Sequence, residues 1–449
     1  MVGQAGVEHL TAVGVECLTA AAGEAAMRRV AGGLRARGVV DGDRVAFALP
    51  NSADLLAALV GTMRAGAVAV PLNPTLLDHE RAALLVDAEP ALVVDTPEAL
   101  AALLDGPEAD LAPVPRSRPM HYTSGTTGRP KGVWSGLLSD ADALALADEE
   151  VSLWGFGAGD LNLVVSPLYH SAPLRFAAAT LLHGGDVVVL PKFEAGLASS
   201  VIASMRPTTA FLVPAHLQRL FAQGELPPLD SFRLVLHAGA PCPEPIKRAA
   251  VEAFGMERLW EFYGSTEGQF TVCSSAEWFE RPGTVGRARP GRALSIDDDG
   301  TIWCDVPPHA RFEYWRAPEK TAGAWRGSAF TVGDLGRLDD EGYLWLDGRR
   351  DDLVISGGVN VYPLEVEQAL ADLPGLEDVA VFGVDDERWG QRVCVAVVGD
   401  VSSDAVLAWA RDRLAPYKVP KEVHRVAELP RTGTGKVRRS KLATDLGLG

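Results

Sequence analysis

Hydrophobic and polar positions alternate along the first part of the chain in blocks that predict helices and strands in turn. Residues 22–39 have helical spacing, because Ala26, Val30 and Leu34 recur on one side. The next blocks predict a strand, a helix and a second strand, at residues 44–50, 53–65 and 67–72. Strands that alternate with helices are typical of a parallel sheet covered by helices.

The same pattern returns in the middle of the chain. Short, continuous apolar runs that end in Gly or Pro are typical of buried parallel strands. They occur at residues 161–167, 186–191, 209–214 and 232–241. Residues 283–348 differ, because Gly and aromatic residues punctuate short strands there. That region predicts a small antiparallel or barrel-like β subdomain.

A charged segment, Gly348-Arg349-Arg350-Asp351-Asp352, interrupts the apolar pattern. Few apolar contacts can cross such a segment, so we expect an N-terminal domain at residues 1–350 and a C-terminal domain at residues 351–449. The C-terminal part predicts a helix, a pair of strands and a second helix, at residues 364–373, 379–384 with 392–398, and 405–414. The fold class is therefore α/β: layered, mostly parallel sheets with helices and a small β subdomain, followed by a small α+β domain.

Composition and net charge limit the kinds of molecule that the protein is expected to bind. The 449 residues are 47% hydrophobic and carry a net charge of −17, which disfavours nucleic acid or an anionic membrane as the main partner. An anionic ligand must therefore meet a local cationic site. One candidate is a basic run near the C-terminus, for which a solvated basic face is the alternative. Its members are Arg431, Lys436, Arg438, Arg439 and Lys441.

The cysteines and the N-terminus predict a cytoplasmic protein. Five cysteines show neither metal-ligand spacing nor a disulfide pattern, which fits a reducing compartment. No cation precedes Arg28, so the basic start of a signal peptide is missing. No apolar run approaches the ~18 residues of a membrane span.

The loop YTSGTTGRPKGV, at residues 122–133, has the composition that a polyphosphate needs. Its glycines let backbone N–H groups approach an anion, while its hydroxyls and cations add donors and charge. The spacing is not that of a Walker A motif. The loop predicts a nucleoside triphosphate site, with an ordinary polar turn as the alternative.

Further motifs follow in order: EFYGSTEG, GDLGRLDDEGYLWLDGRRDD, ISGGVNVYPLEVE and PRTGTGKVRRSKL, at residues 261–268, 333–352, 355–367 and 430–442. Together with the first loop they resemble the adenylate-forming superfamily of acyl-CoA synthetases, stand-alone adenylation domains and luciferases. The resemblance runs from about residue 18 to the C-terminus. The chain is shorter than is usual in that superfamily, mainly before residue 18 and between residues 66 and 122.

The resemblance implies an acyl-CoA synthetase with ATP, Mg²⁺ and coenzyme A. A carboxylic acid and ATP give acyl-AMP and pyrophosphate, and the CoA thiol then displaces AMP. One alternative passes the acyl group to an acyl-carrier protein or another nucleophile. A second is a non-catalytic nucleotide-binding homologue, which the intact motif residues disfavour. We expect no nucleic acid partner, no integral membrane association, and a monomer or homodimer.

The resemblance implies phosphate and metal ligands. The loop residues Thr123, Ser124, Gly125, Thr126, Thr127, Gly128 and Lys131 are expected around the β- and γ-phosphates. Thr266 is expected at the α-phosphate and Glu267 at Mg²⁺, which prefers few carboxylates together with phosphate oxygens. A charge at a helix N-terminus is the alternative for Glu267.

The resemblance also implies a nucleoside site. Tyr263 and the neighbouring Gly264 are expected at the adenine, with Tyr263 stacked on it. The turn Gly239, Ala240 and Pro241 is expected on the other face. Asp334 is expected to accept both ribose hydroxyls, with Arg349 as a second ribose contact. A core tyrosine and an ordinary Asx turn are the alternatives for Tyr263 and Asp334.

The C-terminal motifs imply a mobile domain with two roles. Lys436 is expected to reach the α-phosphate and carboxylate oxygens during adenylation, and Asp351 to be the hinge of a rotation that withdraws it. After rotation, Ser356, Gly357 and Gly358 are expected to line the pantetheine tunnel. Trp389 and Tyr417 are expected near the CoA nucleotide, although Val419 replaces a cation seen there in some members.

The acyl pocket is the least readable part. The resemblance places it around His170, Phe176, Phe211, Val213 and His237, with Gly239 and Gly264 keeping it open. His170 shapes the acid site or is a satisfied core histidine. Arg175 is an unexpected cation beside this apolar pocket. It either extends to solvent or faces a polar or second carboxylate group on the acid.

Overall fold

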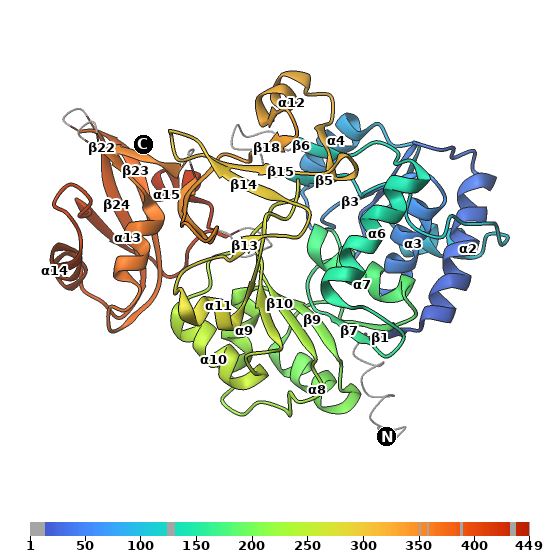
Figure 1. The fold of residues 1–449 in the computed structure, drawn as a ribbon, viewed down its shortest axis with the longest axis horizontal. Helices are drawn as coiled ribbons and strands as arrows, with labels where there is room; N and C mark the ends of the chain where they lie inside the picture. The colour runs from blue at the N-terminus through green and yellow to red at the C-terminus, as the bar shows by residue number, and fades with distance from the viewer. Residues whose placement is uncertain are drawn as a thin grey trace.

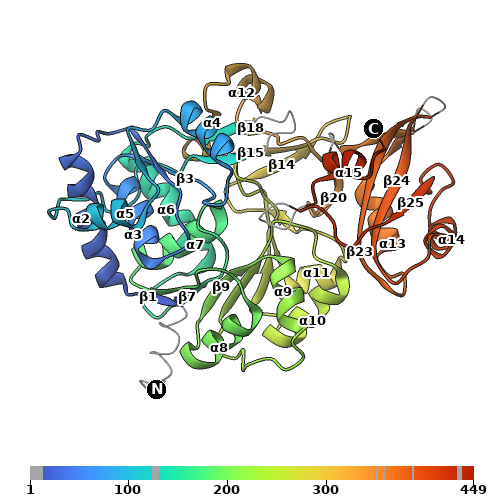
Figure 2. The ribbon, with the colours of Figure 1, turned by 180° about the vertical axis from the view of Figure 1, so that it is seen from behind.

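The computed structural model describes residues 14–123, 131–349, 352–356, 359–386, 389–431 and 437–448, with backbone alone at residues 349, 359, 360 and 440. Figure 1 shows the C-terminal elements, in orange and red, grouped at one side of the rest of the chain. The view from behind in Figure 2 shows the same grouping. No helix in the described ranges is long and apolar enough to cross a membrane.

The largest sheet contains the strands predicted in the middle of the chain. Its centre is parallel, and antiparallel strands complete both edges. In spatial order its strands are β1 (Glu16–Leu18), β8 (Asp186–Val189), β7 (Leu161–Val164), β9 (Thr209–Leu212), β10 (Leu234–His237), β11 (Leu259–Glu261), β12 (Thr271–Ser274) and β13 (Arg287–Ala288).

Helices cover both faces of this sheet, as the continuous apolar strands predicted. On β9, Ala210 and Leu212 pack on one face while Phe211 packs on the other. The first face carries α8 (Ala195–Met205), α9 (Pro214–Phe221) and α10 (Glu244–Phe254). The second carries α6 (Asp140–Trp154) and α7 (Ser171–Leu182), which lie across the sheet from α8 to α10 in Figure 1.

A second, smaller parallel sheet confirms the first predicted block. Its strands are β3 (Val68–Pro71), β2 (Arg44–Phe47) and β4 (Leu92–Val94), with helices α2 (Ala20–Ala36), α3 (Ala53–Arg64), α4 (Asp78–Ala88) and α5 (Pro97–Leu104) beside it. The pattern did not predict β4, α4 or α5. Helix α2 ends before the predicted residue 39 because Gly38 adopts φ +78°, which α-helices do not allow.

Residues 283–348 form short antiparallel strands, as predicted, but in more than one sheet. β14 (Ala293–Ile296), β15 (Ile302–Asp305), β18 (Ala329–Phe330) and β17 (Trp325–Arg326) form one, and β19 (Asp334–Leu338) pairs with β20 (Leu344–Arg349). β16 (Glu313–Tyr314) instead joins β6 (Lys131–Trp134) and β5 (His121–Thr123). The last pairing brings this region against the glycine-rich motif.

The C-terminal residues pack around their own apolar core, which includes Val366, Val395 and Val406. The predicted strand pair is confirmed, and β25, which the pattern did not predict, pairs with it in parallel. The elements are β21 (Val354–Ser356), β22 (Val359–Val361), α13 (Pro363–Leu370), β23 (Leu376–Asp386), β24 (Gly390–Gly399), α14 (Ser403–Arg413), β25 (Glu422–Arg425) and α15 (Arg439–Asp445). The domain boundary at residue 350 stays a prediction, since residues 350 and 351 lie outside the described ranges.

Candidate active site

The hairpin of β5 and β6 carries the ends of the phosphate motif. Thr123 lies opposite Lys131 in its register. The Lys131 ammonium stands 4.8 Å from the centroid of the Tyr314 ring. The Tyr314 hydroxyl donates a 2.9 Å hydrogen bond to Glu267 Oε1. Two motifs far apart in sequence are therefore joined through Tyr314. The predicted ligands Ser124, Gly125, Thr126, Thr127 and Gly128 lie outside the described residues.

The turn that carries Thr266 and Glu267 is closed by a bridge between Gly264 and Gln269. Gly264 must be a glycine, because a Cβ there would lie 2.8 Å from the Gly268 carbonyl oxygen. Arg118 stabilises the turn with two hydrogen bonds. Its Nη2 donates to the carbonyl oxygens of Thr266 and Glu267, at 3.2 and 3.0 Å. Burial, followed by the charge of Arg175, lowers the pKa of Arg118 to about 10.

The two residues proposed for the nucleoside are in contact. Tyr263 and Asp334 are both buried, and the tyrosine hydroxyl donates a 2.6 Å hydrogen bond to Asp334 Oδ2. The Tyr263 ring also packs on Phe270, 4.9 Å between centroids, so it belongs to a core cluster as the alternative foresaw. The register of β19 and β20 sets Arg349 directly opposite Asp334. The side chain of Arg349 is not described.

The turn proposed for the other face of adenine follows β10. Gly239 has φ +93°, a conformation that favours glycine, and it is exposed where the parallel strand ends. Ligands of open α/β sheets bind at the carboxyl ends of such strands. Gly239, Ala240 and Pro241 therefore lie at an edge that suits a ligand.

His170 caps the start of α7, and its ring lies 4.4 Å from that of Tyr169. A second histidine stands beside it: His121 is buried, and its Nδ1 lies 3.0 Å from the Tyr169 carbonyl oxygen. Burial, and next the charge of His170, lowers the pKa of His121 to about 3, so its ring is neutral. Sequence reasoning missed His121, although it directly precedes the glycine-rich motif.

The predicted acyl pocket contains a packed aromatic cluster. Phe211 and Val213 share it with Phe176 and Phe262. The Arg175 guanidinium lies over two of these rings, 5.2 Å from the centroid of Phe176 and 5.7 Å from that of Phe262. The solvated alternative for Arg175 is not what the structure shows. Its Nη2 donates a 2.9 Å hydrogen bond to Gln269 Oε1, and its Nε lies 3.5 Å from Glu150 Oε2.

The structure contradicts the placement of His237 in that pocket. Its side chain is fully buried, and its Nε2 lies 2.6 Å from the Lys247 ammonium of α10. Side chains alternate across a strand. Leu236 packs in the aromatic cluster, so His237 points to the opposite face, towards α10. Lys247 also donates a 2.9 Å hydrogen bond to Glu261 Oε2.

The residues proposed for CoA that the structure describes lie close together. Ser356 pairs with Gly390, next to Trp389. Lys421 links Trp389 to the Tyr417 region, because its ammonium stands 5.5 Å from the Trp389 ring and donates to the Pro416 carbonyl oxygen. Val419, which stands where some family members have a cation, is a core residue. Lys421, two residues later, is the cation beside Trp389. Gly357 and Gly358 lie outside the described residues.

Lys436 and the hinge candidate Asp351 also lie outside the described residues. Their flanks are described. A bridge joins Arg431 to Val437, and Arg439 forms a 2.7 Å ion pair with Glu367 of α13. The basic run is therefore not wholly a solvated face, since Arg431 is also 2.5 Å from Asp378.

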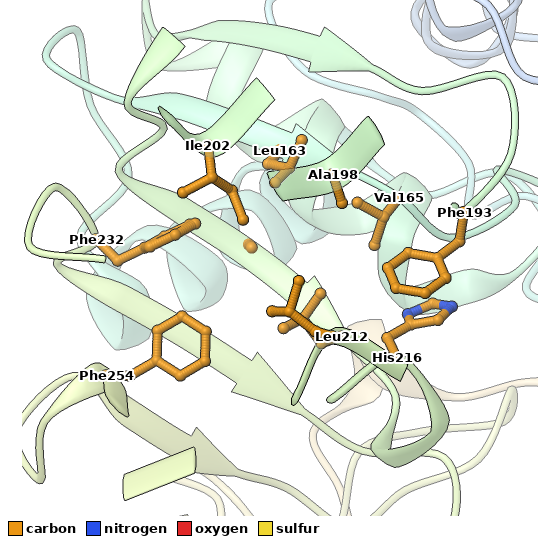
Figure 3. Close-up of a pocket in the computed structure, with 11 residues that line it drawn as sticks. Leu163, Val165, Phe193, Ala198, Ile202, Leu212, His216, Phe232 and Phe254 are labelled. Carbon is orange, nitrogen blue, oxygen red and sulfur yellow. The ribbon is translucent and has the colours of Figure 1, made fainter. Parts of the chain in front are cut away.

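A small cavity lies on the other side of the large sheet. Figure 3 shows Phe193, His216, Phe232 and Phe254 around it, with apolar residues of β7, β9 and α8. Its volume of about 10 Å³ is no more than one water needs. It faces away from Phe176 and Phe211 and is a packing defect of the core, not an acid site.

Comparisons with known proteins identify the family of this chain. The family described as AMP-binding enzyme matches residues 7–307, and the family described as AMP-binding enzyme C-terminal domain matches residues 365–436. Feruloyl-CoA synthase from an Amycolatopsis species is 35% identical over 486 residues, which cover 98% of this chain and 96% of that protein.

Solved structures agree. ATP-bound MatB from Rhodopseudomonas palustris superposes with a TM-score of 0.83 at 32% identity and covers 95% of this chain and 93% of its own. O-succinylbenzoate coenzyme A synthetase (MenE) from Bacillus subtilis, solved with ATP and a magnesium ion, gives a TM-score of 0.83 at 27% identity, with 94% of both chains covered. The resemblance carried by the five motifs is confirmed, and the chain belongs to the AMP-binding enzyme family.

Proposed function

We propose that the chain is an AMP-forming acid–CoA ligase, which activates a carboxylic acid with ATP and transfers the acyl group to coenzyme A. The observation that carries this proposal is the convergence of Lys131 and Glu267 on the Tyr314 side chain. A cation and a carboxylate at one point suit a triphosphate with its metal ion. Relatives named as CoA ligases and synthetases support the same activity.

The first step changes a poor leaving group into a good one. A carboxylate cannot react with a thiol because oxide would have to leave. Attack of the carboxylate on the α-phosphorus of ATP forms a mixed anhydride and releases pyrophosphate. In our assignment Lys131 and the glycine-rich loop bind the phosphates, and Thr266 lies at the α-phosphate. Glu267 would hold Mg²⁺, whose charge would screen the phosphates; one carboxylate suits a metal that binds mainly phosphate oxygens and water.

The nucleoside is positioned by side chains that are already fixed. The Tyr263 hydroxyl donates a hydrogen bond to Asp334, which holds that carboxylate in place for the ribose. We assign Arg349 as a second ribose contact, since it lies across the strand pair from Asp334. His170 is assigned to the acid side of the α-phosphate.

In the second step the CoA thiol attacks the acyl carbon and AMP leaves. We assign Ser356, Trp389 and Tyr417 to the CoA side, with Lys421 as an added cation, and Gly357 and Gly358 to the tunnel. Lys436 serves adenylation, and Asp351 is the hinge between the steps. A cytoplasmic location, a monomeric or dimeric state and an acyl-carrier protein as acceptor stay predictions.

The test separates the two steps. Acid-dependent pyrophosphate release should occur without CoA, and thioester should form only with CoA.

Lys436→Ala should lower adenylation by roughly 10²- to 10³-fold while thioester formation from supplied acyl-AMP persists. Lys441→Ala, in the same basic run, is the matched control and should leave both rates unchanged. Equal loss of both steps in Lys436→Ala contradicts the two roles. Pyrophosphate release with transfer to no thiol would contradict the ligase.

A further inference from the structure

Three phenylalanines close the acid side of the proposed site: Phe176 of α7, Phe211 of β9 and Phe262, which follows β11. Their ring centroids lie 5.7, 5.8 and 6.1 Å apart, and all three side chains are buried. Rings in mutual contact fill the space between the helix and the sheet. A long acyl chain therefore finds this end already occupied by side chains.

A cation stands at the edge of this phenylalanine cluster. The Arg175 guanidinium lies over Phe176 and Phe262, and its side chain keeps 27% of its exposure. A monocarboxylic acid with an apolar tail gains nothing from a charge in that position. Desolvating a guanidinium is costly unless anions face it. The cation thus needs an explanation that an apolar acid does not give.

The described neighbours of Arg175 do not balance its charge. The groups that act most strongly on it are the carboxylates of Glu149 and Glu150 and the guanidiniums of Arg289 and Arg292. Glu150 is already bonded by Arg289 at 2.9 Å, and Glu149 by Arg292 at 2.8 Å. Three cations therefore share two carboxylates. Burial is the main cause that lowers the pKa of Arg175; the guanidiniums of Arg289 and Arg292 add to it, and the carboxylates of Glu150 and Glu149 oppose it.

Arg175 stands on the helix that His170 begins. It follows His170 by five residues, a rise of roughly 7.5 Å along the helix axis. Gln269, which accepts from Arg175 at 2.9 Å, belongs to the same turn as Thr266 and Glu267. The cation and the reacting end are therefore fixed to each other through one helix and one turn.

We propose that the acid is a short aliphatic dicarboxylic acid, with one carboxylate adenylated and the other set against Arg175. This rests on the proposed ligase function and names its substrate class. The second carboxylate supplies the missing anion, and the phenylalanine cluster limits the length. The turn that carries Glu267 also positions Arg175 through Gln269. The same turn therefore fixes the proposed metal ligand and the cation that would bind the second carboxylate.

Matched acid pairs test the proposal: succinate against butyrate, and glutarate against valerate, with decanoate as a long acid. Pyrophosphate release is measured with ATP, Mg²⁺ and CoA. We expect kcat/KM for each dicarboxylic acid to exceed that of its partner by roughly 10²-fold, because only the dicarboxylic acid offers Arg175 a further carboxylate. Decanoate should be poorer than both short dicarboxylic acids.

Variants assign the preference to one residue. Arg175→Met should lower kcat/KM for the dicarboxylic acids by roughly 10²-fold and change that of the monocarboxylic acids by less than about threefold. Arg175→Lys should fall between the two. Arg292→Met is the matched control, since it lies in the same charge network one step away, and should keep the preference. If Arg175→Met fails to fold, the wild-type ratios and Arg175→Lys decide.

The outcomes separate this inference from the ligase function. Preference for butyrate or decanoate, or an unchanged acid preference in Arg175→Met, overturns the dicarboxylic acid while CoA-dependent turnover keeps the ligase. Absence of pyrophosphate release with every acid of a wide panel overturns the ligase itself.

Discussion

At the residue scale, Tyr314 positions Glu267, the residue that we propose as the Mg²⁺ ligand. The tyrosine hydroxyl orients one carboxylate oxygen, and its ring lies under Lys131. Groups that orient a metal ligand typically change metal affinity by about 10- to 100-fold when they are removed. Tyr314→Phe keeps the ring and deletes the hydroxyl.

We expect Tyr314→Phe to raise the Mg²⁺ concentration for half-maximal adenylation about tenfold, with little change in the thermal midpoint. A Mg²⁺ titration of pyrophosphate release measures it. Tyr343→Phe is the matched control, because that buried hydroxyl contacts Glu277, away from the site. An unchanged Mg²⁺ requirement in Tyr314→Phe would show that the Tyr314 hydroxyl does not position a metal ligand.

Lys247 is the clearest stability prediction for a single side chain. It is fully buried and donates to Glu261, with His237 at its other side. Removing one member of a buried ion pair leaves the other charge uncompensated. Lys247→Met should lower the free energy of unfolding by about 3 to 5 kcal/mol, measured by urea denaturation.

The same substitution at an exposed lysine provides the comparison. Lys192→Met removes a surface cation that pairs with Glu194, and should leave the urea midpoint unchanged. Adding Glu261→Gln to Lys247→Met should recover part of the loss, because the uncompensated carboxylate is then gone. Equal, small effects of both lysine substitutions would contradict the buried pair.

Residue patterns predicted the site only where the chemistry is local in sequence. Glu267 and Asp334 stand inside motifs, and the structure brings each to a partner that has no motif of its own: Tyr314 and Tyr263. Arg118 and Gln269 were missed because their contacts are made across 148 or 94 residues. His237 was misplaced because proximity to Gly239 in sequence says nothing about which face of β10 a side chain takes.

Glycines in α2 decide packing at the element scale. Gly32 is inside the helix, where glycine costs about 1 kcal/mol relative to alanine. A Cβ there would lie 1.7 Å from the Pro107 carbonyl oxygen, and one at Gly33 would lie 2.6 Å from that of Leu103. The helix is thus in backbone contact with α5 and the turn after it.

We expect Gly32→Ala to destabilise the protein by about 1 to 3 kcal/mol despite the better helix propensity, because the backbone must shift. Gly323→Ala in α12 (Pro318–Ala324) is the control, since a Cβ there meets nothing within 4 Å. That change should be neutral or slightly stabilising. Urea unfolding of both proteins measures the contrast. Stabilisation by Gly32→Ala would refute the close contact.

The sequence predicted which segments are strands or helices better than it predicted which strands pair with one another. The apolar runs predicted β7 to β10 because buried parallel strands need no partner-specific pattern. The pairing of β16 with β6 was not predicted, and neither was the strand β25, which pairs with β24, since both pairings are non-local. Gly32 and Gly33 in α2 did not reveal which residues approach them. A close backbone contact requires a glycine on one side only, so the sequence of the other side shows no corresponding pattern.

At the scale of the whole molecule, three histidines of the described residues set the response to acid: His121 and His237 are buried, and His216 is half-buried. Burial lowers the pKa of His121 to about 3 and that of His216 to about 4. Burial and then Lys247 hold the pKa of His237 well below its usual value. All three rings are neutral when folded, whereas in the unfolded chain they bind protons below about pH 6.5.

Because the unfolded state then binds more protons, the free energy of unfolding must fall as the pH drops through 6.5 and must continue to fall towards pH 4. Each histidine contributes up to about 1.4 kcal/mol per pH unit, so the protein should lose about 4 kcal/mol between pH 7.5 and 5.5. Urea unfolding at those two values measures the difference. His216→Gln removes one of the three groups and should reduce the loss by about a third. Equal stability of the wild-type protein at both pH values would mean that water or protons reach these rings in the folded state.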